Sequence, residues 1–353
     1  MTSARIPFEV LKAHLQNDIR NVCAVLAPGG SVQGGYWVAP NPTRGDDKAG
    51  SFKVWLTGPS RGCWKEFDEG GAAQGDVIDL VRYALGLKDS AAVHAWVCQR
   101  YGLADVSSAD AERLKARVER DNRDARIKAD DERRRKAKLA RRTLDNGVPI
   151  SPGSVAWKYL TIVRRIPLAR LRGVGSGRPN DLFVDGQCFW VGPDGQRGAR
   201  PAMLAAMRQP DGTITGAHRT YLQANGQKIS EGAAKKMQGA VAGTAMRVWL
   251  GDGATDRVLL TEGIEDALSC ACAAPNVPCF AVGSLNGLAD FKPPEGWDLR
   301  ELIVFKDNDW AGSAAARGFD RAMTKLRGLG LRVSVASAPE GHKDANDMLQ
   351  PEG

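Results

Sequence analysis

The 353-residue sequence lacks several features that define other classes of protein. It has no apolar run near the roughly 20 residues that a membrane-spanning helix needs. Its start, M-T-S-A-R-I-P-F-E-V, has no apolar core of a signal peptide. Its seven cysteines are odd in number and none are spaced C-x-x-C, so neither a disulfide framework nor a zinc cluster is indicated. We therefore expect a cytoplasmic protein with free thiols and no membrane partner.

The composition is that of a globular protein with more than one domain. Hydrophobic residues make up 43% of the chain and charged residues 25%, which argues against a disordered protein. The net charge of +8 fits a partner with a phosphate backbone or an anionic membrane, but many basic proteins bind neither. Charge alone therefore does not decide the function.

Changes in composition divide the chain into four parts: residues 1–103, 104–147, 148–250 and 251–353. The first part mixes a helical start, short strands such as G-S-F-K-V-W-L and a closing helix, which predicts a small α+β module. Residues 148–250 alternate short strands with turns, and a hairpin is expected over residues 202–222. From residue 257 apolar strands alternate with helices, which predicts a parallel sheet covered on both faces. The fold class is thus multidomain, α+β followed by α/β.

Residues 110–142 contain no Gly or Pro and predict a long, exposed connecting helix. This segment holds 14 Lys and Arg against 8 Asp and Glu, so it accounts for +6 of the net charge. Because the charges alternate at helical spacing, a solvated face is favoured over a nucleic-acid arm. The residues best placed to touch phosphate are Arg133, Arg134, Arg135, Lys136 and Lys138.

Acidic residues follow three of the predicted C-terminal strands. They are Glu262 with Asp266 four residues on, then Asp307 and Asp309, then Asp344 and Asp347 on either side of Asn346. Carboxyl ends of parallel strands meet at one edge of a sheet, and carboxylates that converge there repel one another unless a cation lies between them. The pattern predicts a magnesium or manganese site. A single D-x-D could equally be a capped turn, but three such motifs in order are less easily explained by chance.

The segments T-E-G-I-E-D-A-L, F-K-D-N-D-W-A-G and P-E-G-H-K-D-A-N-D-M-L resemble the Toprim catalytic domain, which DnaG-type primases, topoisomerases and some nucleases share. The resemblance implies a Rossmann-like parallel sheet, catalytic roles for Glu262, Asp307 and Asp309, and a supporting acidic role for Asp266. It also implies that Glu262, Asp307, Asp309, Asp344 and Asp347 are metal ligands. Here D-A-N stands in place of the primase D-P-D, so the ligand among residues 344, 346 and 347 stays open.

The block before the Toprim motifs resembles the α+β subdomain that precedes Toprim in primases. Its hairpin R-P-A-M-L-A-A-M-R-Q-P-D-G-T-I-T-G-A-H-R-T-Y-L is followed by Gln227 and Lys228. By resemblance Arg219 and Lys228 line the groove for nucleotide and template, and His218 and Tyr221 are weaker candidates. The alternative is an ordinary polar face of a hairpin.

The N-terminal segments K-A-G-S-F-K-V and G-G-A-A-Q-G-D-V-I-D-L-V resemble the zinc-ribbon domain of primases. The first ligand pair is replaced by A-P-N-P, and around Cys63 only W-K-E-F-D-E-G-G remains, so we expect a module without zinc. The candidates for single-stranded DNA binding are Lys48, Lys53, Trp55, Arg61, Trp64 and Lys65. Alternatively, Trp55 and Trp64 belong to the core of a small sheet.

The resemblance as a whole implies a DNA primase like those of phages and mobile elements, acting in the cytoplasm of a bacterial host. No G-x-x-x-x-G-K-[ST] motif is present, so a partner helicase would be a separate protein. A topoisomerase would need a further large domain with its nucleophilic tyrosine. The expected partners are single-stranded DNA and ribonucleoside triphosphates, with Mg²⁺ or Mn²⁺ as cofactor. Two alternatives stay open: a Toprim nuclease, and a DNA-binding replication subunit without catalysis.

Overall fold

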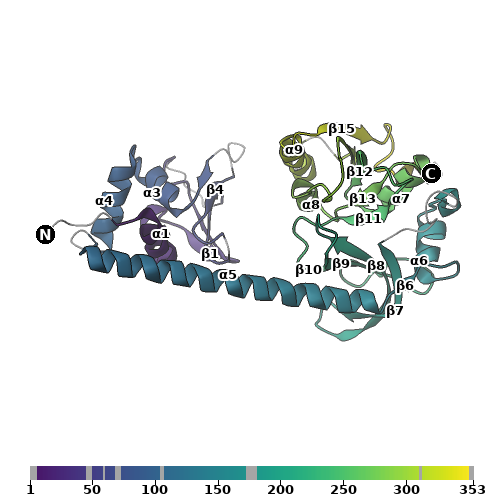
Figure 1. Ribbon diagram of the computed structural model, residues 1–353, viewed down its shortest axis with the longest axis horizontal. Helices are drawn as coiled ribbons and strands as arrows, with labels where there is room; N and C mark the ends of the chain where they lie inside the picture. Colours follow the sequence, from purple (N-terminus) through teal and green to yellow (C-terminus); the bar gives the residue numbers. More distant parts are fainter. Residues whose placement is uncertain are drawn as a thin grey trace. The chain divides into compact units, whose positions relative to one another are not determined.

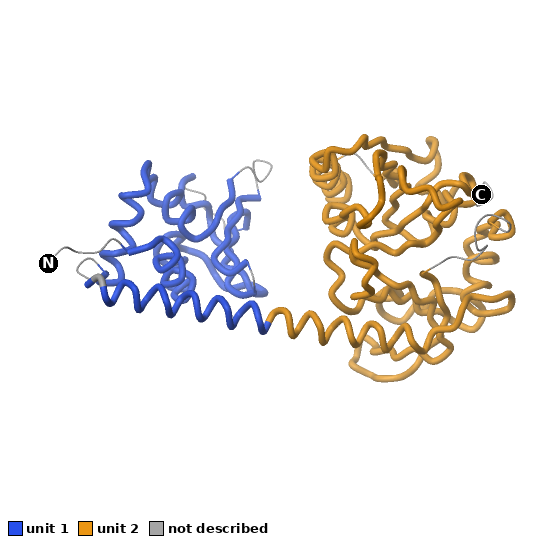
Figure 2. The backbone as a smooth tube through the Cα atoms, viewed as in Figure 1, with its two compact units in different colours: residues 1–128 blue, residues 129–353 orange. Residues whose placement is uncertain are grey.

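The computed structural model describes residues 6–44, 50–58, 60–67, 73–103, 107–171, 181–309 and 312–349. The chain separates into two compact units, Met1–Lys128 and Ala129–Gly353, which Figure 2 shows in two colours. The division falls inside one long helix, α5 (Ser108–Asp145), seen in Figure 1. No helix of the described ranges has both the length and the apolar character needed to cross a membrane. The seven cysteines, all within these ranges, are free, as predicted.

Unit 1 is the small α+β module that the sequence predicts. Its antiparallel sheet has the order β1 (Ser31–Gln33), β2 (Tyr36–Ala39), β3 (Phe52–Trp55), β4 (Trp64–Glu66) and β5 (Gln74–Gly75). Its helices are α1 (Phe8–Asn17), α2 (Ile19–Leu26), α3 (Val77–Leu85) and α4 (Ser90–Arg100). Phe52 and Trp64 from the sheet share one core with Leu11 and Leu80 from the helices.

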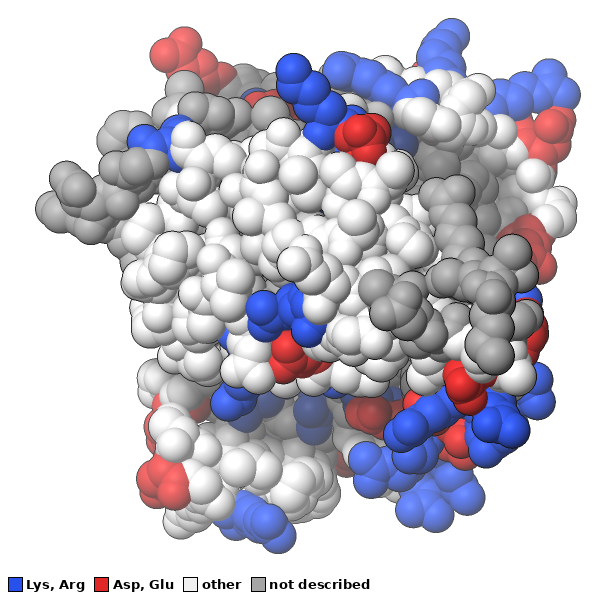
Figure 3. All heavy atoms as spheres, turned by 90° about the vertical axis from the view of Figure 1, so that its left-hand side faces the viewer, with Lys and Arg blue, Asp and Glu red and all other residues white. Residues whose placement is uncertain are grey.

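Helix α5 confirms the predicted charged helix and extends it at both ends. Within unit 1 its residue Ala111 joins the core, and within unit 2 Ala140 and Leu144 are buried. The residues between are largely exposed. Pairs one helical turn apart, such as Lys136 with Glu132 at 2.7 Å, stabilise the helix itself. Figure 3 shows one face of the molecule, on which Lys and Arg side chains lie close to Asp and Glu side chains at several places.

The first sheet of unit 2 is antiparallel and has the strand order β10-β9-β8-β7-β6. Its strands are β6 (Val148–Pro149), β7 (Leu182–Val191), β8 (Arg197–Arg208), β9 (Ile214–Tyr221) and β10 (Lys235–Gly239). Strands β8 and β9 form the predicted hairpin. Before β7 lie α6 (Val155–Lys158), a π-helical turn η2 (Tyr159–Val163) and a 3₁₀ turn η3 (Leu168–Leu171).

The two faces of this sheet have different neighbours. Successive side chains of a strand point to opposite faces. On β8, Met203 and Ala205 join a core that includes residues of the C-terminal sheet and its first helix. Leu204 and Ala206 point the other way and pack with Ala140 of α5. The side of the sheet on which a residue lies therefore decides whether it can reach the C-terminal site.

The second sheet of unit 2 has the order β11-β13-β12-β14-β15. Its strands are β11 (Met246–Trp249), β12 (Arg257–Thr261), β13 (Cys279–Ala281), β14 (Glu301–Lys306) and β15 (Arg332–Ser337). Between them lie α7 (Ile264–Ala273), α8 (Leu285–Ala289) and α9 (Ala314–Arg327), and η4 (Asp347–Leu349) follows the last strand. Helix α7 contributes to the core on one face, and α8 and α9 contribute to the core on the other.

This architecture confirms the predicted parallel sheet with both faces covered. Four strands are parallel, but β11 runs antiparallel to β13, an edge strand that the sequence pattern did not predict. In Figure 1 helices α8 and α9 lie near one another, and α7 lies beside β11 and β13. The parallel strands β12, β14 and β15 are neighbours, so their carboxyl ends share one edge of the sheet.

Candidate carboxylate and lysine site

Carboxylates gather where the parallel strands end. Glu262 follows β12 directly, Asp307 follows β14, and Asp344 lies in the loop after β15. The register pairs Leu260 of β12 with Val304 of β14, and Val304 with Val335 of β15, so these strands end side by side. The sheet thus positions acidic residues from three separate segments at one edge, as the spacing of the motifs predicts.

These carboxylates influence one another electrostatically. Burial raises the pKa of Glu262, and the carboxylates of Asp307 and Asp309 raise it further. Burial likewise raises the pKa of Asp307, with added repulsion from Asp344 and Asp309. The pKa of Asp266, on α7, is raised to about 7 by burial and by the charges of Asp344 and Asp307. Repulsion between like charges requires proximity, so the five side chains form one acidic site.

The chemistry of this site fits a hard divalent cation. In the described part of the chain, no group of three or more His, Cys, Asp or Glu is close enough together to hold a metal ion. The oxygen donors nevertheless suit Mg²⁺ or Mn²⁺, and a cation would relieve the repulsion that raises their pKa values. Glu262, Asp307, Asp309 and Asp344 are the residues that would hold it. The metal, like the expected lack of zinc, stays a prediction.

The three polar residues of the last motif have different surroundings. Asp344 faces the acidic site, because its charge raises the pKa of Asp307 and Asp266. Asp347 accepts a hydrogen bond from the backbone N–H of Lys343 at 2.9 Å, so it holds its own loop. Asn346 is fully buried and its backbone N–H donates to Asp266 at 3.1 Å. The structure thereby favours Asp344 as the ligand and gives Asp347 and Asn346 structural contacts.

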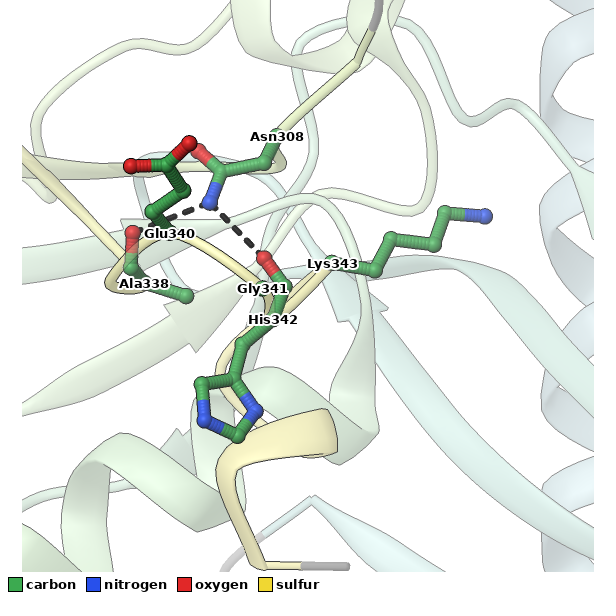
Figure 4. Close-up of a pocket in the computed structure, with 6 residues that line it drawn as sticks. All are labelled: Asn308, Ala338, Glu340, Gly341, His342 and Lys343. Carbon is green, nitrogen blue, oxygen red and sulfur yellow. Dashed lines mark hydrogen bonds between the residues drawn. The ribbon is translucent and has the colours of Figure 1, made fainter. Parts of the chain in front are cut away.

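Asn308, between the two aspartates of the D-x-D motif, links that motif to the last acidic loop. Its side-chain amide donates to the backbone carbonyls of Ala338 at 2.9 Å and His342 at 2.8 Å, and its backbone N–H donates to Lys343 at 2.7 Å. Figure 4 shows the amide pointing at both carbonyls inside a hollow. That hollow is lined by Asn308, Ala338, Glu340, Gly341, His342 and Lys343. The contacts keep Asp307 and Asp344 in neighbouring segments.

Two lysines that precede the Toprim-like segments, Lys235 of β10 and Lys228 in the loop before it, have one buried partner in common, Glu265 of α7. The charge of Lys235, on β10, lowers the pKa of both Glu262 and Asp307, so it is close to both carboxylates. Lys228 forms an ion pair at 3.4 Å with Glu265, a buried residue of α7. The sequence predicted Lys228 but not Lys235. The adjacent Lys235 and Lys236 look alike in sequence, and only the register of β10 distinguishes their faces.

His218 and Arg219 lie on opposite faces of β9. His218 faces the acidic site but is 4% exposed, and burial together with Lys235 lowers its pKa to about 4. It is therefore neutral near pH 7 and gives no charge to a phosphate contact. Arg219 lies over the ring of Tyr221, 5.6 Å from its centroid, and donates to the carbonyl of Phe189 at 3.4 Å. Its pairing partner on β8, Leu204, packs toward α5.

The structure does not bring together the two residues predicted to line the groove: Arg219 lies on the α5 face of the sheet and Lys228 pairs with Glu265 of α7, and their roles in binding stay a prediction. The alternation of side chains along β9 turns Arg219 to the α5 face of the sheet. Tyr221 also points to that face and is buried, so it is no closer to the carboxylates. Lys228 and Lys235, by contrast, have Glu265 of α7 as a common partner.

The candidates in unit 1 separate in the same way. Lys53, Trp55 and Lys65 lie on the outer face of the sheet, where β3 and β4 pair Lys53 with Lys65. Trp64 is 3% exposed and packs against Phe52 in the core, so of the two predicted alternatives the core position holds for Trp64. The reason is again alternation: in β4, Trp64 and Lys65 must point to opposite faces. Lys48 lies outside the described residues.

The outer face also holds aromatic residues that sequence reasoning did not single out. Tyr36 lies edge-on to Trp55, with ring centroids 5.4 Å apart. Phe67 is half exposed, and Lys53 lies 5.3 Å from its ring centroid. Arg61 lies apart from them in the turn between β3 and β4 and donates to the carbonyl of Asn17. The outer face thus alternates lysines and aromatic rings.

Two protein-family models match the chain. Residues 134–248 match a domain of unknown function, DUF7146, and residues 257–353 match the Toprim domain. The predicted C-terminal Toprim domain is thereby confirmed, and the acidic site lies at the strand ends of this domain. A comparison with curated protein sequences finds no match.

Several solved primase structures are similar to this chain at low identity. The Aquifex aeolicus primase, with its zinc-binding and RNA polymerase domains, is 16% identical over 99% of this chain and 82% of that one, with a TM-score of 0.37. The E. coli primase catalytic core is 14% identical over 62% and 74%, with a TM-score of 0.36. The primase fragment of the bacteriophage T7 primase-helicase is 18% identical over 47% and 60%, with a TM-score of 0.32.

Proposed function

We propose that this protein synthesises short RNA primers on a single-stranded DNA template. The observation that supports this most is the position of Lys235 near the acidic site, with Lys228 held beside it because both lysines pair with Glu265. Carboxylates that raise one another's pKa suit the divalent cations of nucleotidyl transfer, and nearby ammonium groups suit the phosphates of the substrate. A site with this mixture of charges fits a nucleoside triphosphate bound with its metal.

The reaction would join two nucleotides. The 3′-oxygen of one nucleotide bonds to the α-phosphorus of the next, the bond from that phosphorus to the bridging oxygen breaks, and pyrophosphate leaves. Bound Mg²⁺ would neutralise the triphosphate and lower the pKa of the attacking hydroxyl. Glu262, with its raised pKa, is suited to accept the proton of that hydroxyl. Asp307, Asp309 and Asp344 would hold the metal, and Lys228 and Lys235 would orient phosphates.

The outer face of the unit 1 sheet would bind the template. Aromatic rings stack on unpaired bases, and lysines contact the phosphates between them. Tyr36, Trp55 and Phe67 supply the rings, and Lys53 and Lys65 the charges. In this proposal the module works without zinc, and a separate helicase of the phage or mobile-element host system supplies the single strand.

The test is incorporation of radiolabelled ribonucleotides on a single-stranded DNA template with Mg²⁺. We expect short RNA products that depend on both template and metal, and none with EDTA. Cleavage of the template without any nucleotide would instead support a Toprim nuclease. Tight DNA binding with neither products nor cleavage would support a non-catalytic replication subunit.

A further inference from the structure

The buried carboxylate of Glu265 joins four structural elements. Glu265 is 2% exposed and lies in the first turn of α7. It accepts a hydrogen bond from the hydroxyl of Tyr159 in the π-helical turn η2. Lys235 of β10 donates to it at 3.1 Å, and Lys228, after β9, lies at 3.4 Å. One carboxylate therefore has two ammonium groups and one hydroxyl as partners.

This cluster is poorly explained as a device for stability alone. Desolvation of buried ion pairs consumes most of the attraction that they gain, so such pairs often contribute little net stability. The two lysine side chains are 34% and 41% exposed, while the carboxylate beneath them is nearly inaccessible. Both lysines thus extend from a buried anion toward solvent. Lys228 also lies 5.6 Å from the centroid of the Tyr159 ring, which further restricts it.

Lys235 acts on carboxylates of the acidic site, and the partner that the two lysines share places Lys228 beside it. Lys235 lowers the pKa of Glu262 and Asp307, and both lysines contribute to the lowered pKa of His218. A ligand with metal-bound phosphates at the carboxylates would therefore also meet these ammonium groups. The remaining neighbour, Glu265, contacts the lysines and is too deeply buried to touch such a ligand.

We propose that Glu265 is a positioning residue, which holds the ammonium groups of Lys228 and Lys235 side by side so that they bind the phosphates of a nucleoside triphosphate. This inference rests on the proposed function, because it assigns a phosphorylated substrate to the same site. It adds a role for Glu265, which lies within the segment T-E-G-I-E-D-A-L but to which the sequence analysis assigns no function. Glu265 itself makes no contact with substrate.

Two opposite effects of removing the Glu265 charge must be compared. Loss of a negative charge makes the site more positive, which favours anions. However, burial already lowers the pKa of Lys228, and Glu265 opposes that shift. Without the carboxylate two neighbouring ammonium groups repel each other, so one of them loses its proton or moves into solvent. The net charge of Lys228, Lys235 and Glu265 is +1, and it is again +1 if the Glu265 charge is removed and one lysine becomes neutral. Since the net charge is then unchanged, phosphate binding weakens because the two ammonium groups are no longer held side by side.

The test measures binding of inorganic tripolyphosphate by titration calorimetry at low salt, in EDTA and without template. We expect Glu265→Gln to weaken binding about tenfold, which corresponds to about 1.4 kcal/mol. Lys235→Ala should weaken binding by a similar factor. Because Glu265 acts through the lysines, the double variant should lose little more than either single variant.

Lys236→Ala is the matched control, because Lys236 is the next residue of the same strand and points to the opposite face, where it donates to the carbonyl of Val191. Lys236→Ala should change the dissociation constant of tripolyphosphate little, and the Lys236→Ala/Glu265→Gln double variant should show the product of the two single fold-changes. Binding by Glu265→Gln as tight as or tighter than wild type would overturn the inference. So would a Glu265→Gln/Lys235→Ala double variant whose fold-change equals the full product of its two single fold-changes.

A second variant covers the case in which Glu265→Gln does not fold. Glu265→Asp keeps the charge but shortens the side chain, so we expect a smaller loss, about threefold, that is again not additive with Lys235→Ala. Unchanged affinity in Glu265→Asp would count against the inference. The binding assay needs no primer synthesis. If the wild-type protein makes no primers but the variants show this non-additive loss of tripolyphosphate affinity, the proposed function fails and the phosphate site stands. If the protein makes primers but the variants show no such loss, only the role of Glu265 is removed.

Discussion

Among the described residues each unit buries one glutamate, and the two carboxylates have different partners. Glu66 of unit 1 is 1% exposed and accepts a hydrogen bond at 2.7 Å from Asn41, which is itself buried. Glu265 of unit 2 is 2% exposed and faces two lysines that reach the surface. The amide of Asn41 also donates to the hydroxyl of Tyr83 on α3. The first carboxylate thus belongs to a polar network within a core.

Burial of a carboxylate therefore does not by itself indicate a role in ligand binding. Both glutamates have lost nearly all contact with water, but their partners differ. In unit 1 the network joins β4 to α3 through Asn41 and Tyr83, and one guanidinium, that of Arg44, lies 3.9 Å from the carboxylate, which suits a stabilising role. In unit 2 two cations share one anion beside the acidic site.

The largest effect is expected at the acidic site of unit 2. Asp307→Ala or Asp309→Ala should lower primer synthesis by more than about a hundredfold, because each removes an oxygen donor from the metal site. Neither change opens a core cavity, and both relieve repulsion, so the melting temperature without metal should stay equal or rise. Primer assays and calorimetry check the two parts. Wild-type activity in either variant would remove these residues from the metal site.

The next effect separates two tryptophans of the unit 1 sheet. Trp64→Ala should cost about 3–5 kcal/mol of unfolding free energy, because it empties a core position between Phe52 and Tyr83. Trp55→Ala should cost less than about 1 kcal/mol and instead weaken single-stranded DNA binding by roughly 1–3 kcal/mol. Denaturant unfolding and fluorescence anisotropy measure the two quantities. Equal loss of stability in both variants would place Trp55 in the core as well.

These tryptophans also mark what the sequence could and could not predict. Three acidic motifs, each after an apolar strand, predicted the parallel sheet and the acidic site. Strands that alternate with helices run parallel, so their carboxyl ends lie at one edge of the sheet. The face on which a strand residue lies depends on register, which no local pattern of β4, β9 or β10 determines. The sequence therefore left the position of Trp64 open, grouped Arg219 with Lys228 and missed Lys235. The edge strand β11 has four residues and pairs antiparallel, so it lacks the strand–helix alternation that revealed its neighbours.

A pH-dependent effect is expected from Asp266. Its folded pKa of about 7 lies above that of a free aspartate, so the folded state binds a proton more readily than the unfolded state. Without metal, this stabilisation is complete below about pH 4 and is lost as the pH rises through 7. Asp266→Asn should therefore raise the unfolding free energy at pH 8 by roughly 1–4 kcal/mol and leave it unchanged at low pH. Urea unfolding in EDTA at both pH values checks this, and a stabilisation that is the same at both would contradict it.

The difference between Glu66 and Glu265 is tested directly by Glu66→Ala. This change removes an acceptor of the buried Asn41 amide, which should cost about 1–3 kcal/mol of unfolding free energy in unit 1. Tripolyphosphate affinity should stay that of wild type, whereas Glu265→Gln should lower it. The same calorimetric titration of both variants measures the contrast. A comparable loss of affinity in Glu66→Ala would mean that the two buried glutamates do not differ as proposed.

The smallest effect distinguishes the two faces of the sheet in unit 2 that lies before the Toprim domain. If the template follows the face with the acidic site, Lys228→Ala should flatten the dependence of log affinity on log salt by about 0.7, because one phosphate contact and its released counterion are lost. Arg219→Ala should leave the slope unchanged, since Arg219 points to the α5 face and is engaged by Tyr221 and Phe189. Salt titrations of single-stranded DNA binding measure both slopes. A flattened slope in Arg219→Ala with no change in Lys228→Ala would show that the template runs along the α5 face, and the lysines would then serve the nucleotide alone.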